Sequence, residues 1–225
     1  MANNQDNYLQ ITASLQAYGV TLVAVSKTKP VEDILALYKL GQRDFGENYV
    51  QELVEKARQL PPDIRWHFIG HLQTNKVKLI APFVQLIHGV DSLKLLKEIN
   101  KEAGKTNRVV DCLLQCFIAQ EETKFGLDEE ELHLLVEELD KLKMPGVRVV
   151  GLMGMGSFTE DMNKVRSEFR KLKELFNKYS KDQTSNFQLQ TLSMGMSSDY
   201  KTAIEEGSTM IRIGSLLFGE RANRQ

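Results

Sequence analysis

The chain has 225 residues, which is enough for one large domain or two small ones. Its hydrophobic content of 42% and charged content of 26% are ordinary for a soluble globular protein. A net charge of −1 argues against a nucleic-acid partner or an acidic membrane surface. Residues 1–6 are too polar for a signal peptide, and no apolar run is long enough to span a membrane. Cys112 and Cys116 lie too far apart along one strand-like run to bridge, so we expect free, buried thiols in a cytoplasmic protein.

Helical and strand patterns alternate along the chain. A leading helix is predicted over about residues 6–18, where apolar side chains recur at helical spacing and Gly19 follows. Strands are predicted over residues 22–26, 43–48, 65–70, 84–90, 109–117, 147–153, 187–192 and 209–213. Helices are predicted over residues 31–38, 49–60, 73–81, 93–103, 128–142, 161–179 and 198–206, with a short helical piece after Ser215.

Strand–helix alternation of this kind calls for a parallel sheet in an α/β protein. Eight units of this size predict a closed (β/α)₈ TIM barrel with an extra N-terminal helix. An open, doubly wound sheet is the alternative, but no glycine-rich dinucleotide fingerprint follows the first strand. No linker, repeat or low-complexity segment interrupts the pattern, so we expect residues 1–225 to form a single domain.

The first strand ends at Lys27, which is followed by Thr28, Lys29 and Pro30. Alternation along the strand places Lys27 on the same face as Val23 and Val25. A lysine at the end of a buried strand is costly unless its charge is paired or its pKa falls. A desolvated amine is a nucleophile, and such lysines typically form a Schiff base with an aldehyde or ketone. The alternative is that Lys27 extends out of the strand end into water.

In a barrel of this kind, functional groups cluster at the carboxyl ends of the strands. The candidates there are Lys27, Asn48, His67, His71, His88, Gln115, Lys124, Met153, Ser197, Ser198, Arg212, Gly214 and Ser215. The loops after the seventh and eighth strands are the recurrent phosphate site of the barrel.

Ser197 and Ser198 are predicted to begin a helix, so their backbone N–H groups and hydroxyls would face a bound anion. Gly214 and Ser215 offer a second set of backbone N–H groups. Arg212 is the last inward candidate of the eighth strand. Taken one at a time, Ser198 fits a helix cap, Gly214 fits a turn and Arg212 fits a structural ion pair. Together, these residues favour a phosphate site. A Schiff-base lysine and a phosphate site in one barrel imply a phosphorylated aldehyde, either pyridoxal 5′-phosphate (PLP) or a phosphosugar held by an aldolase.

Several long motifs agree in order with one known family. They are AVSKTKP (24–30), FGENYVQE (45–52), WHFIGHLQTNK (66–76), LSMGMSSD (192–199) and RIG (212–214). With these motifs the sequence closely resembles the YggS/PROSC family of PLP homeostasis proteins, from about Leu22 to Gly219.

The resemblance implies a fold-type III PLP barrel, similar to the N-terminal domain of alanine racemase. It implies that Lys27 carries PLP as an internal aldimine and that Ser197, Gly214 and Ser215 hold the phosphate. It also implies that Arg212 faces the pyridine nitrogen. We include Asn48, His67, Met153 and Ser198 as further cofactor-binding candidates.

The EETKFG segment (121–126) looks like the family segment with a second lysine of interest, here Lys124. One departure from the family lies after Gln115, where Cys116-Phe117 replaces the usual Val-Asn. We expect Lys29 and Lys76 to be solvated, and either can serve as a transient PLP acceptor.

The expected function is that of a PLP carrier or buffer that regulates amino-acid and keto-acid pools. Alanine-racemase-like enzymes need a tyrosine base from a second domain, and the predicted single domain leaves none. The alternative is a weak PLP-dependent racemase or lyase. The predicted partners are PLP and apo PLP enzymes as acceptors, with a monomeric chain. His67 and His71 lack a third ligand at sensible spacing, so a metal site is not predicted.

Overall fold

The computed structural model describes residues 2–119, 126–181 and 183–219. Eight parallel strands close into a barrel in sequence order, with β1 beside β8. The strands are β1 (Thr21–Val25), β2 (Asp44–Glu47), β3 (Arg65–Phe68), β4 (Leu86–Val90), β5 (Val110–Gln115), β6 (Val147–Met153), β7 (Phe187–Ser193) and β8 (Met210–Ile213). This arrangement confirms the predicted barrel and excludes an open sheet.

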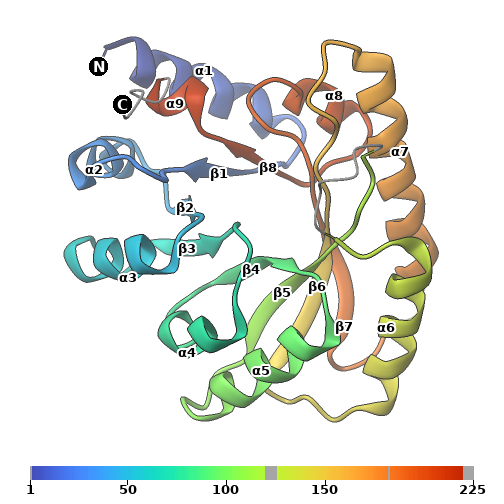
Figure 1. The fold of residues 1–225 in the computed structure, drawn as a ribbon. Helices are drawn as coiled ribbons and strands as arrows, with labels where there is room; N and C mark the ends of the chain where they lie inside the picture. The colour runs from blue at the N-terminus through green and yellow to red at the C-terminus, as the bar shows by residue number, and fades with distance from the viewer. Residues whose placement is uncertain (1, 120–125, 182, 220–225) are drawn as a thin grey trace.

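Helices surround the strands (Figure 1). They are α1 (Ala2–Gln16), α2 (Val31–Lys39), α3 (Val50–Gln59), the 3₁₀ helix η1 (Thr74–Lys76), α4 (Val77–Ile80), α5 (Leu93–Gly104), α6 (Glu129–Lys141), α7 (Met162–Tyr179), α8 (Tyr200–Glu205) and α9 (Ser215–Phe218). Helix α1 lies beside α9, and the Asn7 amide donates to the Leu216 carbonyl at 3.0 Å. None of the helices in the described ranges has the length and apolar character needed to cross a membrane.

Local sequence signals explain where several helices begin. Ser92 accepts a hydrogen bond from the Leu95 amide at the start of α5. Asp128 and Glu131 form a reciprocal capping box at α6. The Asp161 side chain caps two amides at the start of α7. These caps satisfy amide groups that would otherwise lack partners in the first turn of each helix.

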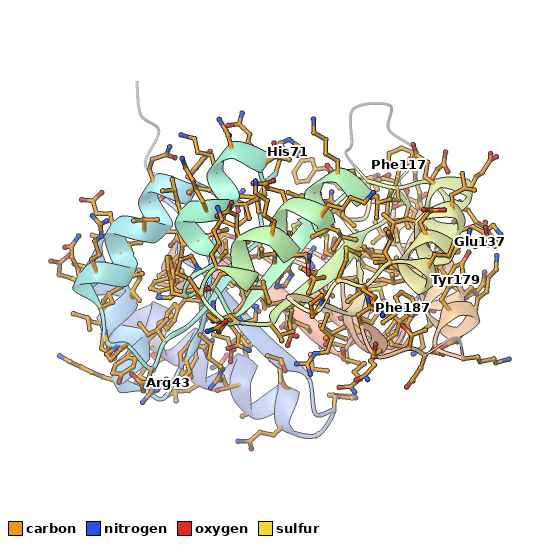
Figure 2. The ribbon with its side chains drawn as sticks, turned by 90° about the horizontal axis from the view of Figure 1, so that it is seen from below. Arg43, His71, Phe117, Glu137, Tyr179 and Phe187 are labelled. Atoms are coloured by element: carbon orange, nitrogen blue, oxygen red, sulfur yellow. The ribbon has the colours of Figure 1, made fainter. Side chains whose placement is uncertain are left out.

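The strands have two differently packed faces. Outward side chains such as Phe45 and Ala24 join the large core between strands and helices. A smaller apolar cluster of Val23, Leu86, Leu113, Met153 and Met210 fills part of the barrel interior. Figure 2 shows how side chains fill the space around the ribbon, with Glu137, Tyr179 and Phe187 gathered near α6, α7 and β7.

Helices α1 and α8 begin two or more residues away from their predicted first residue. Helix α1 begins at Ala2 rather than near residue 6. The prediction missed its first turn because the residues there are polar and show no apolar periodicity. Helix α8 begins at Tyr200 rather than Ser198. The Asp199 carboxylate accepts from the Met196 amide at 2.6 Å and holds a separate turn before the helix.

Candidate functional site

A cavity of about 420 Å³ lies at the carboxyl ends of β1 and β8. It lies within the size range of pockets for small ligands. Seven of the nine predicted cofactor-binding residues line it: Lys27, Asn48, Ser197, Ser198, Arg212, Gly214 and Ser215. Lys29, named from the sequence as a transient PLP acceptor, also lines it, together with six residues that the sequence did not single out: Val25, Ile69, Met155, Phe158, Met196 and Gly219. Most of these additional residues are apolar, so the cavity is lined by polar side chains and by an apolar wall.

Lys27 is half-buried in the tight turn that follows β1. The next residue, Thr28, has a left-handed backbone angle φ of 65°, which is unfavourable for a β-branched side chain. Its amide donates to Glu52 Oε1 at 2.6 Å, and this bond helps to hold the turn. Lys29 is not simply solvated as predicted, because its ammonium donates to the carbonyls of Phe218 and Gly219 at 2.8 and 3.2 Å. The turn is therefore tied to both α3 and the end of α9.

A buried charge cluster supports this turn from behind. The Ser26 hydroxyl donates to Glu47 Oε1 at 2.6 Å. The Lys56 ammonium donates to the Ser26 carbonyl, to Glu47 Oε1 and to Glu52 Oε1, each at 2.7 Å. Burial raises the pKa of Glu47 to about 6, although Lys56 and Ser26 oppose that shift. These groups thus hold the backbone next to Lys27 in place. Burying their charges would be unfavourable if they were not paired with one another.

Asn48 follows β2 and presents a buried Oδ1 atom with no hydrogen-bond partner in the described structure. Such an atom is costly unless something else satisfies it. Gly70 is essential to this geometry, because a Cβ at that position would lie 2.3 Å from the Asn48 carbonyl oxygen. The Asn48 backbone can approach the β3 end only because residue 70 is glycine.

The predicted phosphate residues meet between the ends of β7 and β8. The Gly214 amide points to Ser197 Oγ at 3.4 Å, and Ser215 is the first residue of α9. Gly195 has a φ of 94° and lies so close to Ala203 that a side chain there would clash. Gly214 is different, because a Cβ there would make only ordinary contacts. Ser197 and Ser198 lie in the turn before α8 and not in its first turn, which corrects the predicted helix start.

Arg212 is buried in β8, with its guanidinium facing the barrel interior and the cavity. Its Nη1 donates to Ser193 Oγ at 2.6 Å and its Nη2 to the Gly154 carbonyl at 3.1 Å. Burial lowers the pKa of Arg212 to about 10, against the opposing charge of Asp199. A guanidinium has five N–H donors, so these two bonds leave others for a ligand.

Two of the predicted cofactor-binding residues lie outside this cavity. His67 points into the barrel, where its ring bonds His88 at 2.9 Å and Asp44 at 3.0 Å. Met153 belongs to the interior apolar cluster. His71 lies apart from His67 and pairs with Asp91 at 3.4 Å. Among the residues that the structure describes, no three potential ligands gather as a metal site would require.

Two further sequence features have separate outcomes. Lys124 lies outside the described residues. Cys116, at the departure from the family pattern, is buried beside Leu127, and burial raises its thiol pKa to about 12. Cys112 and Cys116 are both free and buried, as predicted.

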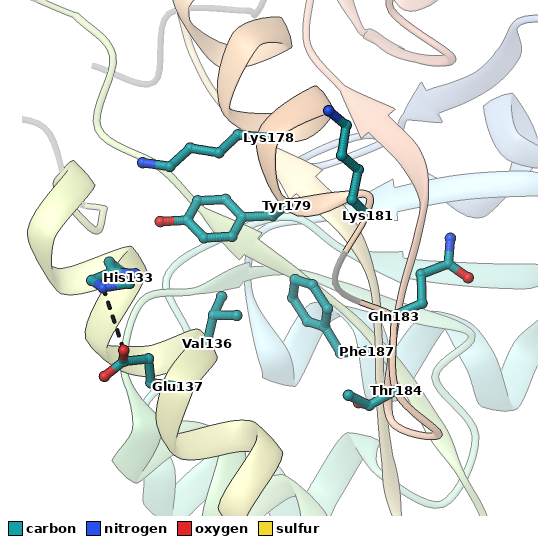
Figure 3. A pocket seen from close by; sticks show the side chains of 9 residues that line it. All are labelled: His133, Val136, Glu137, Lys178, Tyr179, Lys181, Gln183, Thr184 and Phe187. Carbon is teal, nitrogen blue, oxygen red and sulfur yellow. Dashed lines mark ion pairs between the residues drawn. The ribbon is translucent and has the colours of Figure 1, made fainter.

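A second cavity, of about 480 Å³, lies between α6, α7 and the start of β7 (Figure 3). Val136 and Phe187 contribute apolar surface, and His133 pairs with Glu137 at 3.5 Å. None of the described residues that line this second cavity was selected from the sequence for chemistry. The Lys27 cavity is therefore the candidate functional site.

The fold and the Lys27 cavity define a class of proteins. These are parallel eight-stranded barrels with a lysine just past the first strand and serine hydroxyls and glycine amides after the last two. The family model described as "Alanine racemase, N-terminal domain" matches residues 1–222, and the chain belongs to this family.

The curated relatives specify the family more closely. The chain is 47% identical over 201 residues to the pyridoxal phosphate homeostasis protein of Aquifex aeolicus, covering 89% of this chain and 86% of that one. It is 43% identical over 218 residues to the human pyridoxal phosphate homeostasis protein, covering 92% and 78%. The structure of PipY from Synechococcus elongatus with PLP bound superposes with a TM-score of 0.83 at 34% identity, covering 92% of this chain and 98% of PipY. The chain is a member of the pyridoxal phosphate homeostasis protein family.

Proposed function

We propose that this protein binds PLP in the Lys27 cavity and acts as an intracellular PLP carrier and buffer. The observation that carries this proposal is the convergence of Lys27, Arg212, Gly214 and Ser215 on one cavity. The names of the curated relatives and the PLP bound to PipY support it.

The donor set of the cavity fits PLP. Lys27 supplies the amine for a Schiff base with the aldehyde. The N–H groups of Gly214 and Ser215 and the Ser197 hydroxyl would hold the phosphate, and the nearby Ser198 would support them. The remaining Arg212 donors would face the pyridine nitrogen. Asn48 Oδ1 has no hydrogen-bond partner among the described residues, so a donor group of a ligand at this place would satisfy a buried acceptor.

Bound PLP supplies an aldehyde and an electron-withdrawing ring. A fixed positive charge at Arg212 would keep the ring nitrogen unprotonated and make the ring a weaker electron sink. None of the described residues that line the cavity is a tyrosine. These features favour binding and release of PLP over amino-acid turnover.

The visible spectrum of the purified protein loaded with PLP tests the assignment. We expect an absorbance band of protein-bound PLP that Lys27→Ala removes. Lys78→Ala, at an exposed lysine of α4, is the matched control and should keep the band. A band that survives in Lys27→Ala would contradict the proposed attachment point.

A second experiment separates the carrier from a weak racemase or lyase. Loaded protein is incubated with amino acids in D₂O, and α-proton exchange is compared with that caused by free PLP. A carrier should give no excess exchange but should load an added apo PLP enzyme. Exchange well above the free-PLP rate would establish the enzymatic alternative.

We propose a single domain that works as a monomer in the cytoplasm, where its two unpaired thiols stay reduced. Light scattering with and without PLP should give the mass of one chain. A dimer under both conditions would contradict this state.

A further inference from the structure

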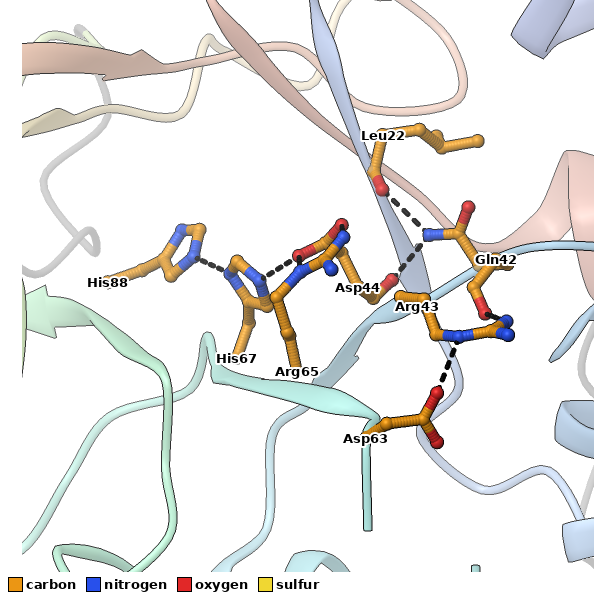
Figure 4. A network of polar contacts seen from close by, with 8 residues as sticks. All are labelled: Leu22, Gln42, Arg43, Asp44, Asp63, Arg65, His67 and His88. Carbon is orange, nitrogen blue, oxygen red and sulfur yellow. Dashed lines mark hydrogen bonds and ion pairs between the residues drawn. The ribbon is translucent and has the colours of Figure 1, made fainter. Parts of the chain in front are cut away.

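A line of polar side chains crosses the barrel interior from Arg212 to the amino end of β2. Arg212 Nη1 lies 2.6 Å from Ser193 Oγ, which lies 3.2 Å from His88 Nδ1. His88 Nε2 lies 2.9 Å from His67 Nδ1, and His67 Nε2 lies 3.0 Å from Asp44 Oδ1. Figure 4 shows the section from His88 to Asp44. We call these five residues the interior chain.

The interior chain is expensive to bury. Ser193 and His88 are fully buried, and His67 and Arg212 are only 2% and 4% exposed. Apolar side chains of similar volume would often give equal or greater stability at such positions. The neighbouring interior cluster of Val23, Leu86, Leu113, Met153 and Met210 shows that this barrel does use apolar filling where it can. Stability alone therefore does not account for the interior chain.

With both imidazole rings neutral, the Asp44 end fixes the direction of every hydrogen bond: the carboxylate can only accept, so His67 donates to it from Nε2 and accepts at Nδ1. Arg212 can only donate, so Ser193 Oγ accepts from it. Because neutral His88 carries its proton on Nε2, its Nδ1 accepts from the Ser193 hydroxyl. His88 Nε2–H donates to His67 Nδ1, and His67 Nε2–H donates to the Asp44 carboxylate. Burial, together with the nearby charge of Arg212, lowers the pKa of His88 far below its ordinary value, in keeping with a neutral His88 ring.

The Asp44 carboxylate is the last hydrogen-bond acceptor of the interior chain, and its other contacts keep it ionised. Its carboxylate also receives two hydrogen bonds from Arg65, at 2.7 Å to Oδ1 and 2.5 Å to Oδ2. Burial alone would raise the pKa of Asp44, but the bonds from Arg65 and His67 lower it to about 2. An ionised acceptor at one end and a cationic donor at the other polarise the bonds between them in one sense.

We propose that Ser193, His88, His67 and Asp44 are positioning residues that orient Arg212 for the cofactor from the opposite end of the barrel. This inference rests on the proposed function for what Arg212 faces. The PLP site thereby extends, through one directed series of hydrogen bonds, to residues that lie outside the lining of the Lys27 cavity.

The first experiment needs no cofactor. Long-range ¹H–¹⁵N spectra of ¹⁵N-histidine protein report which ring nitrogen carries the proton, and the chain has only four histidines. We expect neutral Nε2–H forms for His67 and His88, with the exposed His71 and His133 as internal references. A neutral Nδ1–H form or a charged ring at His88 would overturn the direction assigned here.

The second experiment compares two matched ion pairs at strand starts. Asp44→Ala breaks the end of the interior chain, whereas Asp111→Ala breaks a similar bidentate pair with Arg148 that touches no histidine. We expect the PLP dissociation constant to rise about fivefold to tenfold in Asp44→Ala and to stay within about twofold in Asp111→Ala. Equal effects would overturn the proposal. Absence of PLP binding by the unaltered protein would instead refute the proposed function and leave the ring assignment standing.

Rescue by a conservative variant separates positioning from packing. His88→Leu fills the space but removes both hydrogen bonds. His88→Gln can accept from Ser193 through its carbonyl and donate to His67 through its amide. We expect His88→Leu to weaken PLP binding about tenfold and to shift the absorbance of bound PLP, and His88→Gln to restore most of both. Full binding and an unshifted spectrum in a folded His88→Leu protein would overturn the proposal.

Discussion

The carboxylate of Glu47 lies 2.7 Å from the ammonium of Lys56, and both side chains are almost completely removed from water. The same carboxylate accepts from Ser26, the residue immediately before Lys27. A buried ion pair is thus hydrogen-bonded to the residue that precedes the proposed Schiff-base lysine. Its main effect is on the geometry of that turn, because desolvation offsets much of its attraction.

Removing Lys56 should destabilise the protein. Lys56→Met leaves the buried Glu47 carboxylate without its cation, and we expect a loss of about 3–5 kcal/mol in unfolding free energy at pH 8. Urea denaturation measures this loss, with the exposed Lys78→Met as the control. The double variant Glu47→Leu/Lys56→Met should recover part of the stability. A double variant less stable than Lys56→Met would refute this explanation.

Glu47 should also make stability depend on pH. Burial raises its pKa from 4.5 to about 6, so between these pH values the folded protein holds a proton that the unfolded chain has released. Stability should therefore fall as pH rises through this window, by at most about 2 kcal/mol. Denaturation at both ends of the window, compared between the unaltered protein and Glu47→Gln, isolates this contribution. The same pH slope in both proteins would assign it to another group.

Gly70→Ala should damage the site through Asn48. The new methyl would lie 2.3 Å from the Asn48 carbonyl oxygen, so the backbone must move. We expect a stability loss of about 1–3 kcal/mol together with weaker PLP binding. Gly104→Ala, in α5 with open space around it, is the control and should stabilise the helix by up to about 1 kcal/mol. Unchanged PLP affinity in Gly70→Ala would show that Asn48 does not contribute to binding.

Glu168 should hold the loop that follows β6. Its carboxylate accepts from the Ser157 amide at 2.7 Å and from the Ser157 hydroxyl at 2.6 Å. Met155 and Phe158 on this loop line the cavity. Glu168→Ala should cost about 1–3 kcal/mol in stability and raise the PLP dissociation constant, whereas Glu168→Gln retains an acceptor and should lose less. The exposed Glu174→Ala controls for a lost charge on α7, and an equal effect there would exclude this role.

The barrel was predictable because eight apolar segments alternate with amphipathic helices at regular spacing. Alternation within a strand also predicted that Lys27 would follow an inward-facing series, and Val23 does lie inside the barrel. Strand-end reasoning brought together Lys27, Arg212 and Gly214, although they are far apart in sequence.

The interior chain was not predictable in the same way. Alternation can place His67 and His88 on inward faces, but it cannot show which side chains meet across the barrel. The sequence therefore suggested His67 as a cofactor contact, whereas its actual partners come from β2 and β4. The role of Lys29 escaped for a related reason, because its acceptors lie almost two hundred residues away in the chain. Both depend on tertiary geometry that local patterns do not encode.

The Lys27 cavity straddles the seam at which the first and last strands of the barrel join. β1 and β8 pair along four residues, from Thr21 with Met210 to Ala24 with Ile213. A molecule bonded covalently past one strand and gripped past the other would act as a clasp across that seam. Loading would then slow hydrogen exchange most strongly in β1 and β8, so the occupancy of the cavity could be read from the rigidity of the barrel closure.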